Sequence, residues 1–435
     1  MLTPFFRNNK NLDILMMRFV DIGREVAREF GLALGDMSLT EFHLEESNLS
    51  DESLKVIAIA LSTHTRLEEL HLDNIDSVYC LAMKGLLASR ASTLKVIDFS
   101  FNNMNDEGME LLVAGMMHCC DLSQLSLSYN TDFISAEGWR SLSKWLQSDS
   151  CRLEELSLCY IRIDDNGAIA LAQGLTRLQT LKRLDLYHNS FGDEGLRALA
   201  EAMTNCGNLT WLNLSSIKTA GLRALATFFQ SKRCVLKSLA ISGIDFGDEE
   251  AAALAGGLLG NTSLTRLGFS LMRGGSLTAT GWSALSRLVC DPSSINNTYL
   301  SNHTLKHMFY MNHGTDTPSD IKQYLKLNEH HGPRVAAILK ILLKHRDFDM
   351  KTFFQWKLKF LPLVIDWFDR ANSSLDIEWY MDQSADVGLL PFALAYKLPR
   401  QKLSAIYKFI RGVPMLVIDS YQIEKLPLLK KRKLG

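Results

Sequence analysis

The chain has 435 residues, a formal net charge of −1, 47% hydrophobic residues and 22% charged residues. Because this near-neutral balance creates no long-range field, we expect neither nucleic acid nor a membrane surface as a partner. The 8 cysteines have no C-x-x-C spacing, which favours reduced thiols in a core over a disulfide or metal framework. No apolar run of about 18 residues and no apolar signal core are present, so we expect a cytoplasmic protein.

The pattern L-x-x-L-x-L recurs along most of the chain and predicts its architecture. Its starts are separated by 27 to 31 residues, as in 39 − 12 = 27 and 153 − 122 = 31. They fall at Leu12, Leu39, Leu67, Leu94, Leu122, Leu153, Leu181, Leu209, Leu236, Leu264 and Ile295. A fixed period of this size is typical of a leucine-rich-repeat solenoid.

The repeat Leu181–Asn208 predicts the structure of one unit. Leu184 and Leu186 alternate with polar residues, which is the periodicity of a strand. Asn189 then marks a turn, and apolar residues from Leu196 onward recur at helical spacing. Since one unit cannot bury its own apolar face, the units must stack. We expect an α/β fold, a horseshoe-shaped solenoid of about 11 repeats with a parallel sheet inside and helices outside.

The turn after the strand is asparagine in three repeats, at Asn102, Asn130 and Asn189, and Ser47 is a polar substitute. A buried asparagine would hydrogen-bond turn backbone groups that otherwise lack partners. Most other repeats have an apolar residue there. We expect hydrophobic packing to replace the asparagine in those turns.

The ends of the repeat array predict three segments. Residues 1–11 are expected to be an N-terminal remnant or cap, because a solenoid needs its first apolar edge covered. Residues 12–317 are expected to form the solenoid. The repeat that starts at Ile295 should contribute the last strand, around Tyr299 and Leu300.

Residues 318–435 are not repetitive and predict an all-α C-terminal domain that caps the last repeat. Helices are expected at Pro333–His345, Met350–Arg370 and Leu403–Arg411. The basic tail Lys430–Lys433 is compatible with a nuclear location.

The motif D-E-G-x-x-x-L after the strand, in Asp106–Val113 and Asp193–Ala200, resembles the ribonuclease-inhibitor class of leucine-rich repeats. That class includes ribonuclease inhibitor, the repeat domains of NOD-like receptors and Ran GTPase-activating protein. The resemblance implies the solenoid fold and a binding function. The stretch Ser293–Leu305 and the helical segment after it are also similar to repeat proteins of diatoms and related algae, which implies no activity.

Residues two, four and six positions after each start should point out of the sheet, onto the concave face. The early repeats place carboxylates and histidines there, and the middle repeats place aromatic and polar residues. The candidate partner-binding residues are Glu41, His43, Glu45, Glu69, His71, Asp73, Asp98, Tyr129, Tyr160, Arg183, Asp185, Tyr187 and Trp211. An acidic surface attracts basic proteins, and exposed aromatic residues are preferred anchors of interfaces.

His43 and His71 occupy the same position in adjacent repeats. Because adjacent strands lie about 4.8 Å apart, a zinc site is sterically allowed there. The sequence favours a polar ladder on the concave face instead, and we expect no metal and no cofactor.

The sequence has no nucleotide-binding, metalloprotease or serine-hydrolase motif, so we expect no enzyme. The favoured function is a scaffold that binds a protein partner, with a basic surface, on the concave face. The alternative is a regulator of a small GTPase that resembles Ran GTPase-activating protein. Its candidate loop residues are Arg162 and Lys218.

Overall fold

The computed structural model of the chain describes residues 11–75, 81–89, 93–117, 119–130, 132–217, 221–244, 246–270, 277–310 and 317–345. The chain divides into two compact units. The first lies within Met1–Asp291 and Leu300–Pro333 and contains the repeats, and the second lies within Pro292–Tyr299 and Arg334–Gly435. The predicted helices at Met350–Arg370 and Leu403–Arg411 and the basic tail lie outside the described residues.

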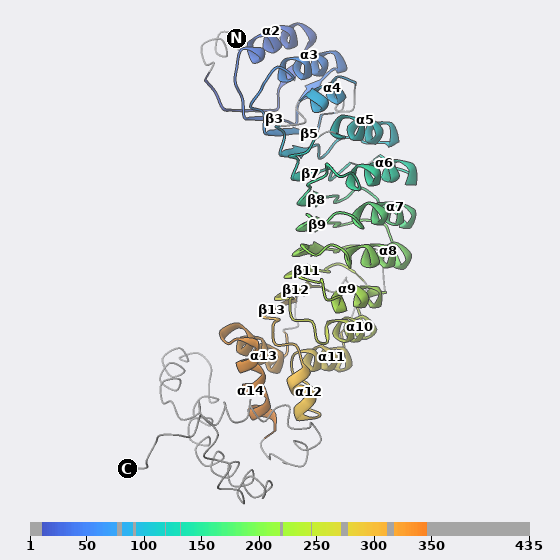
Figure 1. The fold of residues 1–435 in the computed structure, drawn as a ribbon, viewed down its shortest axis with the longest axis vertical. Coiled ribbons are helices and arrows are strands. Elements are labelled where there is room, and N and C mark those ends of the chain that lie inside the picture. Colours follow the sequence, from blue (N-terminus) through green and yellow to red (C-terminus); the bar gives the residue numbers. More distant parts are fainter. Residues whose placement is uncertain are drawn as a thin grey trace, which may run out of the picture. The chain divides into compact units, whose positions relative to one another are not determined.

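An eleven-stranded parallel sheet runs through the repeat unit. Its strands, in spatial order, are β1 (Ile14–Arg18), β3 (Glu41–Glu45), β5 (Glu69–Asp73), β6 (Val96–Asp98), β7 (Gln124–Ser126), β8 (Glu155–Ser157), β9 (Arg183–Asp185), β10 (Trp211–Asn213), β11 (Ser238–Ala240), β12 (Arg266–Phe269) and β13 (His307–Tyr310). The short strands β2 (Asp21–Ile22) and β4 (Asn48–Leu49) pair separately. The strands line the inner, concave side of this unit (Figure 1).

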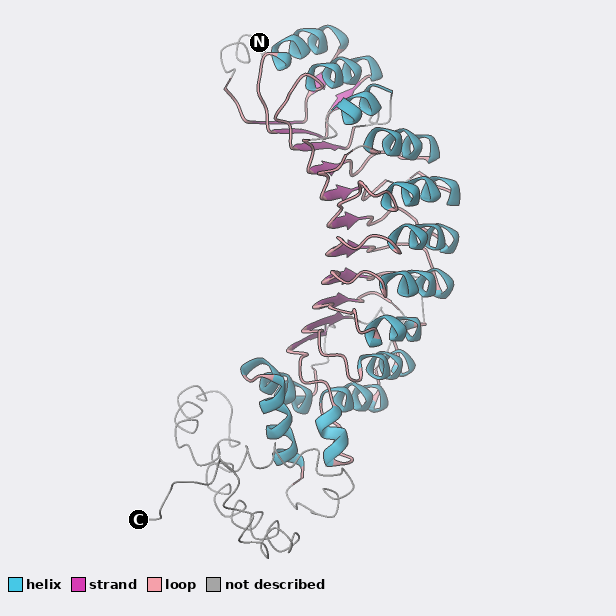
Figure 2. Ribbon diagram, viewed as in Figure 1, coloured by secondary structure: helices cyan, strands magenta, loops and turns pink. Residues whose placement is uncertain are grey.

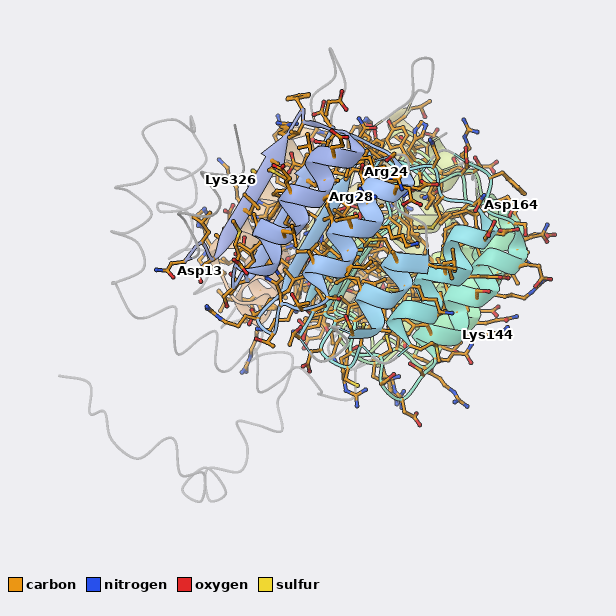
Figure 3. All side chains as sticks on the ribbon, turned by 90° about the horizontal axis from the view of Figure 1, so that it is seen from above. Asp13, Arg24, Arg28, Lys144, Asp164 and Lys326 are labelled. Carbon is orange, nitrogen blue, oxygen red and sulfur yellow. The ribbon has the colours of Figure 1, made fainter. Side chains whose placement is uncertain are left out.

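A helix follows almost every strand and lies on the outer side of the unit (Figure 2). These helices are α2 (Arg24–Gly35), α3 (Asp51–Leu61), α4 (Leu81–Ser89), α5 (Asp106–Met116), α6 (Ala136–Leu146), α7 (Asp165–Leu175), α8 (Asp193–Met203), η1 (Leu222–Leu225) with α9 (Ala226–Gln230), α10 (Asp248–Leu258) and α11 (Ala279–Val289). Seen along the stack, Lys144 and Asp164 lie at the outer boundary of this helical layer (Figure 3). The predicted α/β solenoid is therefore confirmed.

The leucines of the repeat pattern form the core between the two layers. In the repeat that starts at Leu181, the side chains of Leu181, Leu184 and Leu186 are fully buried. Leu196 and Leu199 of α8 are buried from the other side. Alternation along the strand and helical spacing along α8 thus direct both apolar faces to the same layer.

The acidic motif at the start of the helices joins neighbouring repeats. The Asp106 carboxylate of α5 accepts hydrogen bonds from the Ser135 N–H (2.8 Å) and hydroxyl (2.7 Å), just before α6. Asp248 of α10 accepts the equivalent bonds from Thr278, just before α11. A Cβ at Gly138 would lie 2.5 Å from Asp106 Oδ1, so glycine leaves room for the carboxylate of the previous repeat. The aspartate at the start of one helix therefore contacts the glycine at the start of the next helix.

The predicted asparagine turns are confirmed. Asn130 is fully buried, accepts from the Met104 N–H (3.0 Å) and donates to the Phe99 and Leu127 carbonyls (3.0 and 2.8 Å). Asn189 makes the same set of bonds in its own repeat. Asn102 does so too, except that within its repeat it donates to the Ser100 carbonyl. Each asparagine therefore joins its own turn to the backbone of the previous repeat.

The predicted last strand is wrong. Residues Ile295–Leu300 form the helix α12, and the last strand is β13, which follows Leu305. The Ser294 hydroxyl accepts from the Asn297 N–H (3.1 Å), as a capping serine does, and this starts a helix in the stretch that was assigned to a strand. The actual repeat begins at Leu305, which is fully buried.

Two further helices follow β13. The helix α13 (Ser319–His330) contacts α11 and β13 within the repeat unit, and its Asn328 donates to the Leu305 carbonyl (2.7 Å). The helix α14 (Pro333–Lys344) agrees with the predicted helix at Pro333–His345. The assignment of residues 318–435 to a separate C-terminal domain stays a prediction.

Candidate protein-binding face

The sheet brings the predicted site residues into rows that run across the strands. Parallel pairing places Glu41 beside Glu69 and His43 beside His71, and it places Trp211 beside Arg183. The strand side chains expected to point out of the sheet alternate with buried ones, as the burial pattern of β3 and β5 shows. In these two strands the outward offsets agree with the prediction, whereas at offset six of several later repeats the side chain is buried, as at Ser100 and Ser128. The binding role of the site residues stays a proposal.

The acidic part of the face lies on β3, β5 and β6. We call Glu41, Glu45, Glu69, Asp73 and Asp98 the acidic patch. Burial raises the pKa of the Asp73 carboxyl to about 6, and the nearby carboxylates Asp98, Glu45 and Glu46 raise it too, against the lowering effect of Arg18. Charge repulsion within the patch therefore favours the approach of a cation.

Arg18 compensates one edge of the acidic patch. Its guanidinium lies 3.4 Å from Glu45 Oε2 and 2.6 Å from Glu46 Oε1. The sequence analysis missed this contact because it listed the outward residues only from the second repeat onward. In the first repeat, which starts at Leu12, the residue six positions after the start is Arg18.

A row of aromatic rings follows the carboxyl ends of β6 to β9. Phe101 stacks on Tyr129 with ring centroids 4.1 Å apart, Tyr129 on Tyr160 at 4.7 Å, and Tyr160 on His188 at 3.8 Å. Tyr187 meets Tyr160 edge to face at 5.2 Å. We call these five residues the aromatic row. The hydroxyl contact of Tyr160 with Tyr187 is the main cause that raises the pKa of Tyr160 to about 12, so Tyr160 is uncharged near neutral pH.

Four members of the aromatic row adopt a left-handed backbone. The φ angles of Phe101, Tyr129, Tyr160 and His188 are 56°, 58°, 52° and 55°. This region costs roughly 1–2 kcal/mol for an ordinary side chain, and glycine and asparagine adopt it more easily. Two other repeats have those residues at the same position, Asn74 and Gly243. The aromatic side chains therefore occupy strained positions.

The middle of the face contains a cation–π pair. The Arg183 guanidinium carbon lies 3.6 Å from the centroid of the Trp211 ring. Asp185, on the same strand as Arg183, accepts from the Asn213 side chain (3.0 Å). These contacts order Trp211 and Asp185 as parts of one surface that continues from the aromatic row.

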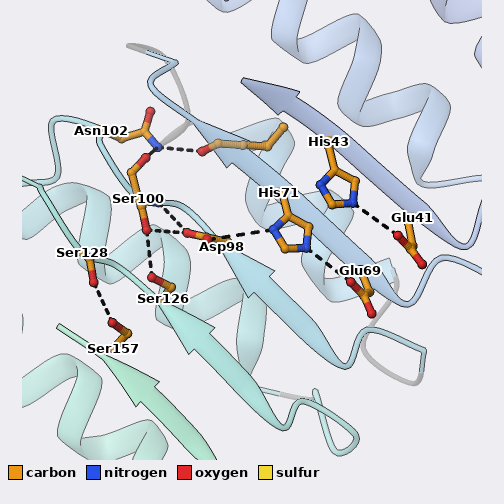
Figure 4. A network of polar contacts seen from close by, with 11 residues as sticks. Glu41, His43, Glu69, His71, Asp98, Ser100, Asn102, Ser126, Ser128 and Ser157 are labelled. Carbon is orange, nitrogen blue, oxygen red and sulfur yellow. Dashed lines mark hydrogen bonds and ion pairs between the residues drawn. The ribbon is translucent and has the colours of Figure 1, made fainter. Parts of the chain in front are cut away.

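Pairs of serines join neighbouring repeats beside the acidic patch and the aromatic row. The hydroxyls of Ser100 and Ser126 lie 2.8 Å apart, as do those of Ser128 and Ser157 (Figure 4). Ser100 also donates to the Asp98 carboxylate (2.5 Å). Side chains of neighbouring repeats are thus hydrogen-bonded across the face.

Tyr129 and Tyr160 were predicted from the sequence as site residues, whereas Phe101 and His188 were not. All four lie seven residues after a repeat start, for example 101 − 94 = 7 and 188 − 181 = 7. An aromatic ring at this offset in four consecutive repeats is the signal that could have found the whole row.

Other candidate groups are less organised. Arg162, a candidate for the GTPase-regulator alternative, is exposed with a φ of 57°, and Lys218 lies outside the described residues. Burial raises the pKa of the Cys119 and Cys206 thiols to about 12, which makes these two unreactive. None of the helices in the described ranges has the length and apolarity needed to cross a membrane.

Comparisons with known proteins agree with this architecture. A family model described as "Leucine Rich repeat" matches residues 90–113 and 177–200. Ribonuclease inhibitor of Sus scrofa is 27% identical over 281 residues, which is 56% of this chain and 61% of that protein. "NACHT, LRR and PYD domains-containing protein 5" of Mus musculus is 27% identical over 248 residues, which is 56% of this chain and 21% of that protein.

Ribonuclease inhibitor of Mus musculus is also 27% identical, over 51% of this chain and 56% of that protein. The chain therefore spans less than two thirds of each of these relatives. An internalin from Listeria monocytogenes has a solved structure that covers 72% of this chain and 89% of its own, at 16% identity and a TM-score of 0.38. On its repeats and its sequence relatives, the chain is a leucine-rich-repeat protein of the ribonuclease-inhibitor-like class.

Proposed function

We propose that this chain binds a protein partner through its concave face, with the acidic patch attracting a basic surface and the aromatic row and Trp211 serving as anchors. Leucine-rich-repeat proteins generally act as protein-interaction modules. The observation that carries the proposal is the aromatic row, since strained backbone positions cluster at functional sites. Asparagine or glycine would satisfy the same turn at lower cost.

The parts of the face suit different stages of binding. Carboxylates at the surface attract a basic partner over a Debye length of about 8 Å at physiological ionic strength. Stacked aromatic rings offer a large and rigid contact area, and such residues dominate the energetics of interfaces. The acidic patch therefore selects the partner, and the aromatic row retains it.

The test is to remove the rings without disturbing the turns. In the variant Tyr129→Asn with Tyr160→Asn, both new residues tolerate the left-handed backbone, so the stability should stay within about 1 kcal/mol of the parent. Binding should weaken by about 2 kcal/mol or more, roughly thirtyfold, once two anchors are lost. Partners are isolated by cross-linking and mass spectrometry, and their affinity for both proteins is then measured in purified form.

The matched control is Ser216→Asn, which changes the same left-handed position outside the aromatic row and should leave binding unchanged. Ribonuclease is one defined probe, because two relatives have the name ribonuclease inhibitor. Equal affinity of the parent and the double variant for every purified partner would exclude the aromatic row as the anchor.

In the alternative function, the partner is a small GTPase whose GTP hydrolysis this chain accelerates. It would need an exposed loop residue that reaches a bound GTPase, and Arg162 is the described candidate. Accelerated GTP hydrolysis by small GTPases that is lost in Arg162→Ala would favour the alternative. If the protein does not change the rate of GTP hydrolysis, the alternative is excluded and the proposed binding function remains.

A further inference from the structure

The acidic patch contains the same Glu-x-His sequence on two adjacent strands. Because β3 and β5 pair in parallel, Glu41 lies beside Glu69 and His43 beside His71. The two imidazole rings stack with centroids 4.1 Å apart and planes inclined by 4°. Each Nε2 lies 3.4 Å from a carboxylate oxygen of its own strand, Glu41 for His43 and Glu69 for His71 (Figure 4).

The two histidines differ in how well their Nε2 atoms are satisfied. Nε2 of His71 is hydrogen-bonded to Glu69 at 3.4 Å. Nε2 of His43 is buried without a hydrogen-bond partner, because its contact with Glu41 is within ion-pair range but lacks hydrogen-bond geometry. A buried polar atom without a partner costs about 1–3 kcal/mol and suggests an unseen ligand.

We propose that His43, Glu69 and His71 bind a zinc ion, with the fourth position open to a water molecule or a partner group. One donor atom from each of His43, Glu69 and His71 lies within 4.8 Å of the others. Tetrahedral zinc with bonds of about 2.0–2.2 Å places its ligand atoms about 3.3–3.5 Å apart. Small rotations of these side chains close the remaining gap.

The donor set and its surroundings select this class of metal. Two imidazole nitrogens with a carboxylate oxygen suit zinc, whereas calcium and magnesium prefer oxygen ligands. The side chains of His43 and His71 are 13% and 22% exposed, so the pair lies close to the surface of the concave face. Nδ1 of His71 faces Asp98 Oδ2 at 3.9 Å, and a carboxylate at this nitrogen orients the ring so that Nε2 points to the ion.

The experiment uses the full chain without a histidine tag, and zinc itself as the probe. Competition with a chromogenic chelator should give one zinc ion per chain. His43→Gln and His71→Gln should each weaken this binding by at least about tenfold. His188→Gln removes an exposed histidine elsewhere on the face and should bind zinc like the parent. Zinc should raise the melting temperature of the parent and of His188→Gln only.

X-ray absorption spectroscopy of the zinc-loaded parent tests the site without any variant, so its result does not depend on whether a variant folds. The spectrum should contain two imidazole ligands at about 2.0 Å. Absence of stoichiometric zinc in the parent, a spectrum without two imidazoles, or full binding by a folded His43→Gln with His71→Gln variant would each overturn the site. The outcome does not depend on any protein partner, so it stands or fails separately from the proposed function.

Discussion

At the scale of single residues, the buried asparagines are the polar groups that the solenoid depends on most directly. Asn130 satisfies a backbone N–H of the previous repeat and two carbonyls at the same time. Its position was predictable because the asparagine stands at a constant distance from the repeat start. The row of left-handed residues one position earlier was not predicted as a whole, since aromatic residues rarely adopt that backbone.

Asn130→Ala should lower the free energy of unfolding by roughly 2–4 kcal/mol, because it leaves buried backbone groups without partners. Chemical denaturation followed by circular dichroism measures the loss. The control is Asn208→Ala, which removes one exposed hydrogen bond to the Gln179 carbonyl and should change stability by less than about 1 kcal/mol. Overlapping unfolding curves for Asn130→Ala and the parent would show that the turn does not need its asparagine.

At the scale of elements, the starts of the helices depend on the preceding repeat. Asp165 of α7 accepts from the N–H groups of Gly192 (2.9 Å) and Gly195 (2.7 Å) at the start of α8. A carboxylate near a helix N-terminus also interacts favourably with the helix dipole. The aspartate at the start of a helix therefore orders the start of the next helix as well as its own.

The contact between Asp248 and Thr278 should make the free energy of unfolding depend on pH. Hydrogen bonds from Thr278 hold the pKa of Asp248 below its ordinary value of 3.8. Since the folded-state pKa is lowered, the stabilisation is present above the ordinary pKa and is lost as the pH falls through the lowered pKa. In melting experiments, Asp248→Asn should be less stable than the parent at pH 7. The difference in stability should shrink below about pH 4. A difference that does not change with pH would contradict a stabilising role of the ionised carboxylate.

The misplaced last strand shows what limits prediction of the elements. The leucine pattern tolerates Ile295 as a repeat start, but the pattern alone does not specify the backbone. A further signal is the sequence N-x-[S/T]-L, which occurs at Asn261–Leu264 and Asn302–Leu305 and, outside the described residues, at Asn372–Leu375. Both asparagines are buried and accept from the N–H groups two and three residues later, just before β12 and β13. The buried asparagine, and not the leucine spacing, marks the true strand.

At the scale of the whole molecule, the acidic patch and the aromatic row follow one another along one continuous sheet and meet in the repeat that starts at Leu94, which contributes Asp98 and Phe101. The sequence predicted this separation of charge and aromatic residues because strand offsets determine which side chains share a face. It could not predict the distances between groups, such as the stacking of His43 on His71. In the proposed function, the acidic patch therefore acts on the association rate, and the aromatic row acts on the dissociation rate.

Glu41→Lys with Glu45→Lys should slow association with a basic partner and weaken its dependence on salt, because long-range attraction acts mainly on the association rate. Trp211→Ala should instead speed dissociation, since a buried aromatic anchor contributes about 2 kcal/mol or more. Surface plasmon resonance at several salt concentrations separates the two rates. If the charge variant changes only dissociation, the acidic patch does not steer the partner.

The end of the repeat array provides the last prediction. The helix α13 buries Ile321, Tyr324 and Leu325 within the repeat unit, and its Asp320 accepts from the Ser286 hydroxyl of α11 (2.6 Å). A fragment of residues 1–317 lacks α13 and exposes the apolar side of the last repeat, whereas a fragment of residues 1–333 retains α13. Terminal repeats need such covers. The shorter fragment should therefore melt at a lower temperature and aggregate more in light scattering than the longer one. Identical melting curves for the two fragments would show that α13 does not stabilise the last repeat.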